Sequence, residues 1–191
     1  MRSETIIIDA GTGSQEIKIV KRKLNGKEAK LLVTAIKNSP DISGYTVREW
    51  VNCSNVFVAE DREGKTLGAC MNDDFAKGWT EIAVLFVFEQ HRERGIGRAF
   101  LNLSLEDARK RNKNVMMLSR NDIVTRMMLE SGLKIISNRA ELPGYLKKHK
   151  LTLTLYYDTR WLMNFYRIFE IIRKKVAFGV RQPFIYGFKM L

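Results

Sequence analysis

The feature of the sequence that most constrains its fold is an apolar run that leads directly into a glycine-spaced turn. The run EIAVLFVF spans Glu81–Phe88, and the segment EQHRERGIGRAF follows it at Glu89–Phe100. After Gly95 the apolar residues recur with the period of a helix. The pattern therefore predicts a buried strand, a tight turn and a helix in direct succession.

The groups around this turn indicate what it could bind. A helix N-terminus leaves backbone N–H groups unpaired and carries partial positive charge, so Gly95 and Gly97 would let an anion approach the backbone. Glycines also permit a tight turn with positive φ that needs no ligand. Arg92, Arg94 and Arg98 surround the turn and favour phosphate binding.

The spacing excludes the common nucleotide-binding loops. Gly95, Gly97 and Phe100 form GxGxxF instead of the dinucleotide fingerprint, and the sequence has no GK[ST] of a P-loop. The segment Ile6–Ser14, IIIDAGTGS, resembles the first phosphate loop of the sugar-kinase and actin-like superfamily. That architecture needs two large lobes and further nucleotide loops, so we expect a strand and a glycine-rich turn here instead.

Periodicity and turn residues predict a mixed order of strands and helices along the chain. The expected strands are Glu16–Leu24, Asn55–Asp61, Lys65–Asp73, Trp79–Phe88, Asn114–Ser119, Leu133–Ser137 and Lys150–Asp158. The expected helical segments are Gly26–Lys37, Ser43–Asn52, one from Gly95 into Arg109–Asn114, and Asp122–Gly132. This order indicates antiparallel hairpins first and a strand–helix–strand unit in the middle.

Charge and cysteine content limit the partners and the compartment. The net charge of +12 favours a polyanionic ligand, partner or surface, and cofactor phosphates, RNA and anionic lipid all fit. Cys53 and Cys70 form no CxxC pattern and have no matching histidine spacing, so we expect neither a disulfide framework nor a metal site. No secretory-signal pattern or apolar run of transmembrane length is found, and we expect a cytoplasmic protein.

The segment around the turn resembles motif A of the GNAT N-acetyltransferases. Arg92, Gly95 and Gly97 match its R/Q-x-x-G-x-G/A signature, and NDIVTRMMLESGL resembles the family's N-x-x-A-x-x-L-Y-x-x-x-G-F segment from Asn121 to the residue after Gly132. The resemblance implies an α/β (α+β), GNAT-like acyl-CoA N-acyltransferase fold. Its central mixed, mostly antiparallel sheet is flanked by helices, and the domain would span residues 1–158.

The resemblance also implies acetyl-CoA as the co-substrate. In this family the strand before the turn separates from its neighbour and pairs with the pantetheine arm, which assigns Leu85 and Val87 to the arm and the thioester. Asn121 would contact the arm from the next helix. The turn would bind the pyrophosphate through Arg92, Arg94, Gly95, Ile96, Gly97 and Arg98.

Glu81 is the expected general base. Only a neutral amine can attack a thioester, so a base or a water chain must take its proton. Glu81 lies eleven residues before Arg92, which resembles the spacing of the base in the family's histone acetyltransferases. Strand alternation would place Glu81, Ala83, Leu85 and Val87 on one face. A solvated glutamate near the start of a strand is the alternative interpretation.

Two residues depart from the family pattern. Met128 stands where many members have a tyrosine that can protonate the leaving thiolate, and Glu89 stands where many have proline. Methionine cannot donate a proton, so water, the acceptor or another residue must do so. By side-chain type alone, the candidate donors are Tyr145, Tyr156 and Tyr157.

We therefore predict an N-acetyltransferase in which a primary amine of unknown identity attacks acetyl-CoA directly in a ternary complex. Neither cysteine lies in the site motifs, which favours this direct route. The alternatives are a longer acyl group donated by CoA or an acyl carrier, and a weakly catalytic CoA-binding module that docks on RNA or a membrane.

The C-terminal segment 159–191 is expected to be an extension of the domain. It is basic and rich in aromatic residues, and its first half has a helical pattern with an unusually wide apolar face. It could cover an open edge of the domain, form a homodimer contact or lie on a membrane surface.

Overall fold

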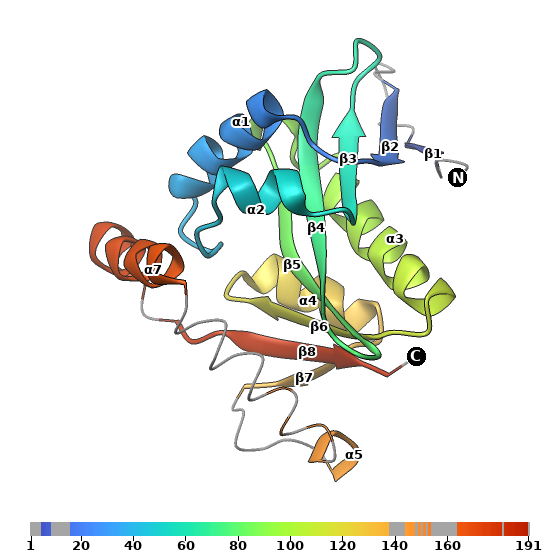
Figure 1. Cartoon of the computed structure of the whole chain (residues 1–191), viewed down its shortest axis with the longest axis vertical. Coiled ribbons are helices and arrows are strands. Elements are labelled where there is room, and N and C mark those ends of the chain that lie inside the picture. The colour runs from blue at the N-terminus through green and yellow to red at the C-terminus, as the bar shows by residue number, and fades with distance from the viewer. Residues whose placement is uncertain are drawn as a thin grey trace.

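The computed structural model describes residues 5–8, 16–137, 144–147, 149, 151, 153, 164–180 and 182–190. Within these residues, eight strands form one sheet in the order β1-β2-β3-β4-β5-β6-β8-β7. The neighbours are antiparallel except for β5 and β6, which are parallel. Helices cover both faces of the sheet (Figure 1). The predicted mixed, mostly antiparallel fold is therefore confirmed.

The bounds of most strands and helices between Ile17 and Ile136 lie close to the sequence-based expectations. The strands are β1 Thr5–Ile8, β2 Ile17–Lys21, β3 Val56–Glu60, β4 Thr66–Ala76, β5 Trp79–Val87, β6 Asn114–Ser119, β7 Lys134–Ile136 and β8 Ile185–Lys189. The helices are α1 Gly26–Lys37, α2 Val47–Asn52, the 3₁₀ turn η1 Glu89–His91, α3 Ile96–Lys110, α4 Asp122–Glu130, α5 Gly144–Lys147 and α7 Phe165–Phe178.

Two apolar layers hold the helices against the sheet. On one face, α1 and α2 pack through residues such as Leu32 and Trp50. Helix α3 packs on the other face through Phe100 and Leu103. Local chemistry positions the helix ends: Asn25 and Glu28 form a capping box that begins α1. This arrangement leaves the N-terminus of α3 at the end of β5.

The last strand was not predicted. Strand β8 lies between β6 and β7, and Phe188 packs with Trp79 and Met116 in a third apolar cluster. Residues 185–189 of the expected extension therefore belong to the central sheet. The expected strand Lys150–Asp158 lies largely outside the described residues, but Leu151 and Leu153 are helical, so a strand there is wrong at these two positions.

Candidate functional site

Strand β5 separates from β6 halfway along its length. The parallel ladder joins Trp79–Ile82 to Asn114–Met117 and ends there, while the rest of β6 continues its pairing with β8 on its other side. Beyond Ile82, no strand of the described chain pairs with this edge of β5. Backbone groups on the edge are therefore available to a ligand, as expected for the pantetheine arm.

A bulge sits at the point where the strands separate. In the pairing of β5 with β4, Val84 opposes Met71 and Ile82 opposes Asn72, so β5 carries one extra residue, Ala83. The Ala83 carbonyl accepts a hydrogen bond from the Tyr45 hydroxyl at 3.1 Å. The bulge thus interrupts the regular alternation of side chains.

This bulge corrects one expectation. We expected Glu81, Ala83, Leu85 and Val87 on one face, but Leu85 and Val87 pack toward α3 with Ile82, whereas Ala83 packs on the opposite face. Alternation from Ile82 places Glu81 on the face of Ala83. The extra residue is the reason, because it shifts the alternation by one position.

The glycine turn leaves the N-terminus of α3 open. Gly95 precedes the helix with a φ of 75°, which favours glycine, and no side chain caps the helix. The first backbone hydrogen bond joins the Ala99 N–H to the Gly95 carbonyl, 3.0 Å apart. The N–H groups of the first turn therefore point outward, and the geometry fits an anion such as pyrophosphate.

Space at the turn also fits close approach of a ligand. A Cβ placed on Gly97 would lie 3.4 Å from the Leu85 side chain, whereas one on Gly95 would meet nothing within 4 Å. Arg92 donates to the Val87 carbonyl at 3.3 Å, and Arg98 forms a 2.7 Å ion pair with Glu130. Part of the arginine charge is thus already engaged by the protein.

The open edge and the turn line one cleft of about 1000 Å³. Of the ten predicted site residues, nine line it, and Arg94 does not. The nine are Glu81, Leu85, Val87, Arg92, Gly95, Ile96, Gly97, Arg98 and Asn121. The structure therefore brings nine of the residues predicted for donor binding and catalysis into one cavity.

The side chain of Asn121 forms structural hydrogen bonds in this cleft. Its side-chain oxygen caps α4 by accepting from the backbone N–H groups of Ile123 and Val124. Its amide nitrogen donates to Asp41 at 2.8 Å. A contact of Asn121 with the pantetheine arm remains a prediction.

Sequence reasoning missed several residues that come to the cleft from distant segments, among them Tyr45, Arg167 and Phe184. The Arg167 guanidinium lies 4.2 Å from the centre of the Tyr45 ring and forms a 2.7 Å ion pair with Glu49. No local motif marks Tyr45 and Arg167, since they meet only after α7 docks beside α2.

His91 also lines the cleft, next to the turn. Burial and the nearby Arg94 lower the pKa of His91 below its usual value, which favours the neutral imidazole. Both ring nitrogens are buried without a hydrogen-bond partner among the described residues.

Met128 lies away from the cleft. Its side chain is fully buried, and its sulfur would lie 2.8 Å from a Cβ placed on Gly187 of β8. The neighbouring Met127 lines the cleft instead. The position that holds a tyrosine in many GNAT proteins is thus part of the core here. Tyr156 and Tyr157 lie outside the described residues.

Comparison with known proteins identifies the family. Residues 30–132, more than half of the chain, match the acetyltransferase (GNAT) family. The chain belongs to this family. The sequence-based prediction of a GNAT acetyltransferase is therefore confirmed. Comparison with curated protein sequences finds no match.

Solved structures show the same fold at low sequence identity. N-acetylglutamate synthase from Neisseria gonorrhoeae, complexed with coenzyme A and N-acetyl-glutamate, has a TM-score of 0.58 and 18% identity over 90% of this chain. The chain covers only 35% of that synthase. Rv2747 from Mycobacterium tuberculosis, in complex with CoA, has a TM-score of 0.59 and 13% identity, covering 91% of this chain and 98% of that one.

A third similar structure is a mutant of the spermidine N-acetyltransferase SpeG from Vibrio cholerae, with a TM-score of 0.51 and 15% identity. That match covers 63% of this chain and 80% of that chain.

Among the described residues, no helix has both the length and the apolar character needed to cross a membrane. Nor do these residues contain a cluster of three or more His, Cys, Asp or Glu side chains suited to a metal ion.

Proposed function

We propose that the protein transfers the acetyl group of acetyl-CoA to a primary amine by direct attack in a ternary complex. The observation that carries this proposal is that the open edge of β5 and the uncapped N-terminus of α3 line the same cleft. An acyl-CoA needs both features at once, because its pantetheine arm carries amides and is joined to a pyrophosphate.

The donor would be held mainly by backbone groups. The N–H groups at Ile96, Gly97 and Arg98 would bind the pyrophosphate, with Arg92 adding charge from the surface. Backbone groups near Leu85 and Val87 would pair with the pantetheine arm along the open edge of β5. Acetyl-CoA supplies the activated acetyl thioester.

The proton of the attacking amine would pass to Glu81, directly or through water. Glu81 lines the cleft, and its side chain is only 8% exposed. When the amine nitrogen bonds to the acetyl carbon and the carbon–sulfur bond breaks, the amine loses one proton and the thiolate gains one. Tyr45 is a candidate for the proton donor, since it lines the cleft and its hydroxyl lies at the bulge.

The cysteines favour direct transfer over an acyl-enzyme. Cys70 is fully buried, and burial raises the pKa of its thiol to about 12, so the thiolate nucleophile is not formed near neutral pH. Cys53 donates to the Asn72 carbonyl at 3.3 Å. Neither cysteine lines the cleft.

The acceptor is proposed only as a class. The similar structures include proteins named for a spermidine and for a glutamate acceptor, both of which are amines. Asp41 and Glu81 add acidic groups to the cleft, and these would attract a cationic amine.

The test is an acceptor screen with the purified protein. Acetyl-CoA is incubated with separate pools of amino acids, polyamines and peptide N-termini, and thiol release and acetylated product are both measured. Product in one pool, dependent on acetyl-CoA, would support the proposal. Faster transfer from longer acyl-CoA donors would assign a different acyl group, and acetyl-CoA binding without any product would indicate a binding module.

A further inference from the structure

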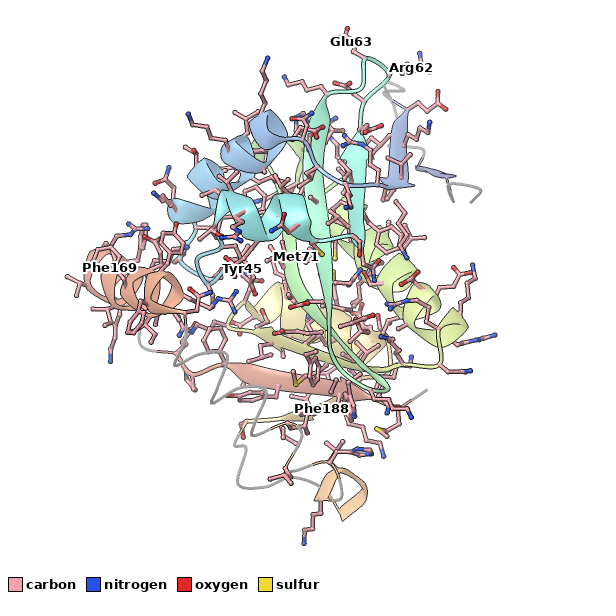
Figure 2. All side chains as sticks on the ribbon, in the orientation of Figure 1. Tyr45, Arg62, Glu63, Met71, Phe169 and Phe188 are labelled. Atoms are coloured by element: carbon pink, nitrogen blue, oxygen red, sulfur yellow. The ribbon has the colours of Figure 1, made fainter. Side chains whose placement is uncertain are left out.

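Helix α7 docks on the domain with its charged face and exposes its apolar face. Arg167, Glu170 and Lys174 are its buried residues, each at most 5% exposed. Phe165, Phe169, Ile172 and Val176 recur at helical spacing on the other side and are 57–80% exposed. We call these four residues the apolar stripe. Figure 2 shows Phe169 on the outer side of α7, away from the sheet.

The docking of the charged face is specific. The Lys174 ammonium donates to the carbonyls of Ile36, Ser39 and Ile42 at 2.5–2.7 Å. An ammonium has three donors, so these acceptors satisfy it fully at the end of α1. Arg173 donates to the Lys37 carbonyl at 2.7 Å.

The N-terminal part of α7 is also held by specific contacts. Arg167 and Asn164 both donate to Glu49 of α2, at 2.7 and 3.1 Å. The Cβ missing from Gly44 leaves room for Glu170, whose Cγ would lie 2.5 Å from it. These contacts fix the rotation of α7, so the helix cannot turn its apolar stripe inward without losing them.

The charges that remain exposed on α7 are basic. Lys175 is exposed beside the stripe, whereas the only acidic residue of the helix, Glu170, is buried and paired at 2.9 Å with the partly exposed Arg173. The chain as a whole carries a net charge of +12. An apolar stripe edged by lysine and arginine is typical of a helix that lies in the surface of an anionic membrane.

We propose that the apolar stripe of α7 docks on an anionic membrane surface. The four side chains would enter the boundary between headgroups and acyl chains, while Lys175 contacts anionic headgroups. The opposite face of the same helix brings Arg167 to the cleft. Helix α7 would thus hold the acetyltransferase domain at the bilayer through one face and contribute to its site through the other.

A second copy of the chain fits this surface less well. A stable interface uses roughly 20–30 residues from each partner, whereas the stripe is four side chains on one helix. A two-fold contact through the stripe would also bring Lys175 of both copies together, and like charges repel. An interfacial helix needs only a stripe of this size.

The experiment measures binding to vesicles and requires no acetyl transfer, so its outcome is independent of the proposed function. The full-length protein is sedimented with vesicles of 70% phosphatidylcholine and 30% phosphatidylserine, and with vesicles of phosphatidylcholine alone. Two variants place a charge in the stripe, Phe169→Glu and Ile172→Glu. Two matched controls, Leu31→Glu and Leu129→Glu, place it at leucines of α1 and α4 that are 62% and 57% exposed.

We expect the wild type to bind the phosphatidylserine vesicles and to bind less as salt is raised. Each stripe variant should bind about tenfold more weakly or worse, because a large apolar side chain no longer enters the bilayer. Both controls should bind as the wild type does, and Lys175→Gln should bind about fivefold more weakly.

Three outcomes would overturn the proposal. The first is the absence of wild-type binding, and the second is equal binding to both kinds of vesicle. The third is a wild-type dimer in analytical ultracentrifugation that Phe169→Glu dissociates, which would make a second copy the occupant of the stripe. Melting temperatures of all variants, measured in parallel, show that a loss of binding does not reflect unfolding.

Discussion

Helices α3 and α7 have nearly the same length and both are amphipathic, yet they use their faces in opposite ways. Helix α3 buries Ile96, Phe100 and Leu103 against the sheet, whereas α7 buries its charged residues and exposes its apolar stripe. Their N-termini also differ, because α3 begins without a side-chain cap and Asn164 caps α7. Amphipathicity therefore shows that a helix has two faces, and it does not show which face meets the protein.

The largest expected effect tests this difference directly. Phe100→Ala should lower the free energy of unfolding by about 3–5 kcal/mol, because Phe100 is fully buried and the substitution leaves a cavity. Phe169→Ala should change it by about 0.5 kcal/mol or less, since that side chain is 64% exposed. Urea unfolding without lipid measures both. Equal losses would mean that the stripe is already covered in solution.

The next effect tests the open N-terminus of α3. Gly97→Glu should weaken acetyl-CoA binding by about a hundredfold or more, because a carboxylate would occupy the place of the pyrophosphate and repel it. Gly97→Ala is the control, since its Cβ would make only ordinary contact with Leu85 at 3.4 Å. Calorimetric titration with acetyl-CoA gives both affinities, and unchanged binding by the glutamate variant would remove the phosphate assignment.

A third prediction concerns Glu81, the proposed general base on β5. Glu81→Gln should lower kcat by about a hundredfold at neutral pH, because the amide cannot accept the amine proton. The loss should shrink at high pH, where the free amine is more abundant. The pH–rate profiles of the two proteins measure this, and identical profiles would assign the proton to water or to another residue.

The smallest expected effect concerns the buried charge under α7. Burial lowers the pKa of Lys174 from 10.5 to about 8. Between these values the unfolded chain binds more protons than the folded one, so stability rises as pH increases from 8 to 10.5. Below pH 8 both states are protonated and the folded state carries the full cost of the buried charge.

For the wild type this rise should be on the order of 2 kcal/mol, and Lys174→Met should lack it. Because both proteins contain Cys70, the opposite effect of its raised pKa cancels in the comparison. Chemical unfolding of both proteins across this pH range gives the difference. Parallel curves would mean that the Lys174 ammonium is stabilised by its three carbonyl acceptors as well as it is by water.

Much of the fold could be predicted because its signals are local. The helix expected at Gly26–Lys37 and the strand expected at Asn114–Ser119 have those bounds in the structure, since the periodicity and the capping residues lie within the segments. Strand β8 was missed because its partners β6 and β7 lie far away in the sequence. Its Gly187 makes room for Met128, a constraint that no neighbouring residue indicates.

The candidate site likewise contains features that local sequence signals predict and features that only tertiary contacts determine. The family and the glycine turn before α3 were predicted from the sequence, because spacing along one segment specifies Gly95, Gly97 and the arginine before them. The face of the sheet on which Glu81 lies was not predicted correctly, because the bulge at Ala83 arises from pairing between two strands. Tyr45 and Arg167 were missed because they meet only through the docking of α7.

The sequence alone determined that this chain has a GNAT fold with a glycine turn between a strand and a helix, since backbone conformation and periodicity act over a few residues. The tertiary structure decided which way α7 faces. That choice depends on carbonyls at the end of α1 and on Glu49 of α2, which satisfy Lys174 and Arg167 only when the chain is folded. The acceptors that satisfy these buried charges lie in other segments, so no local pattern in the segment 159–191 indicates which face of α7 docks.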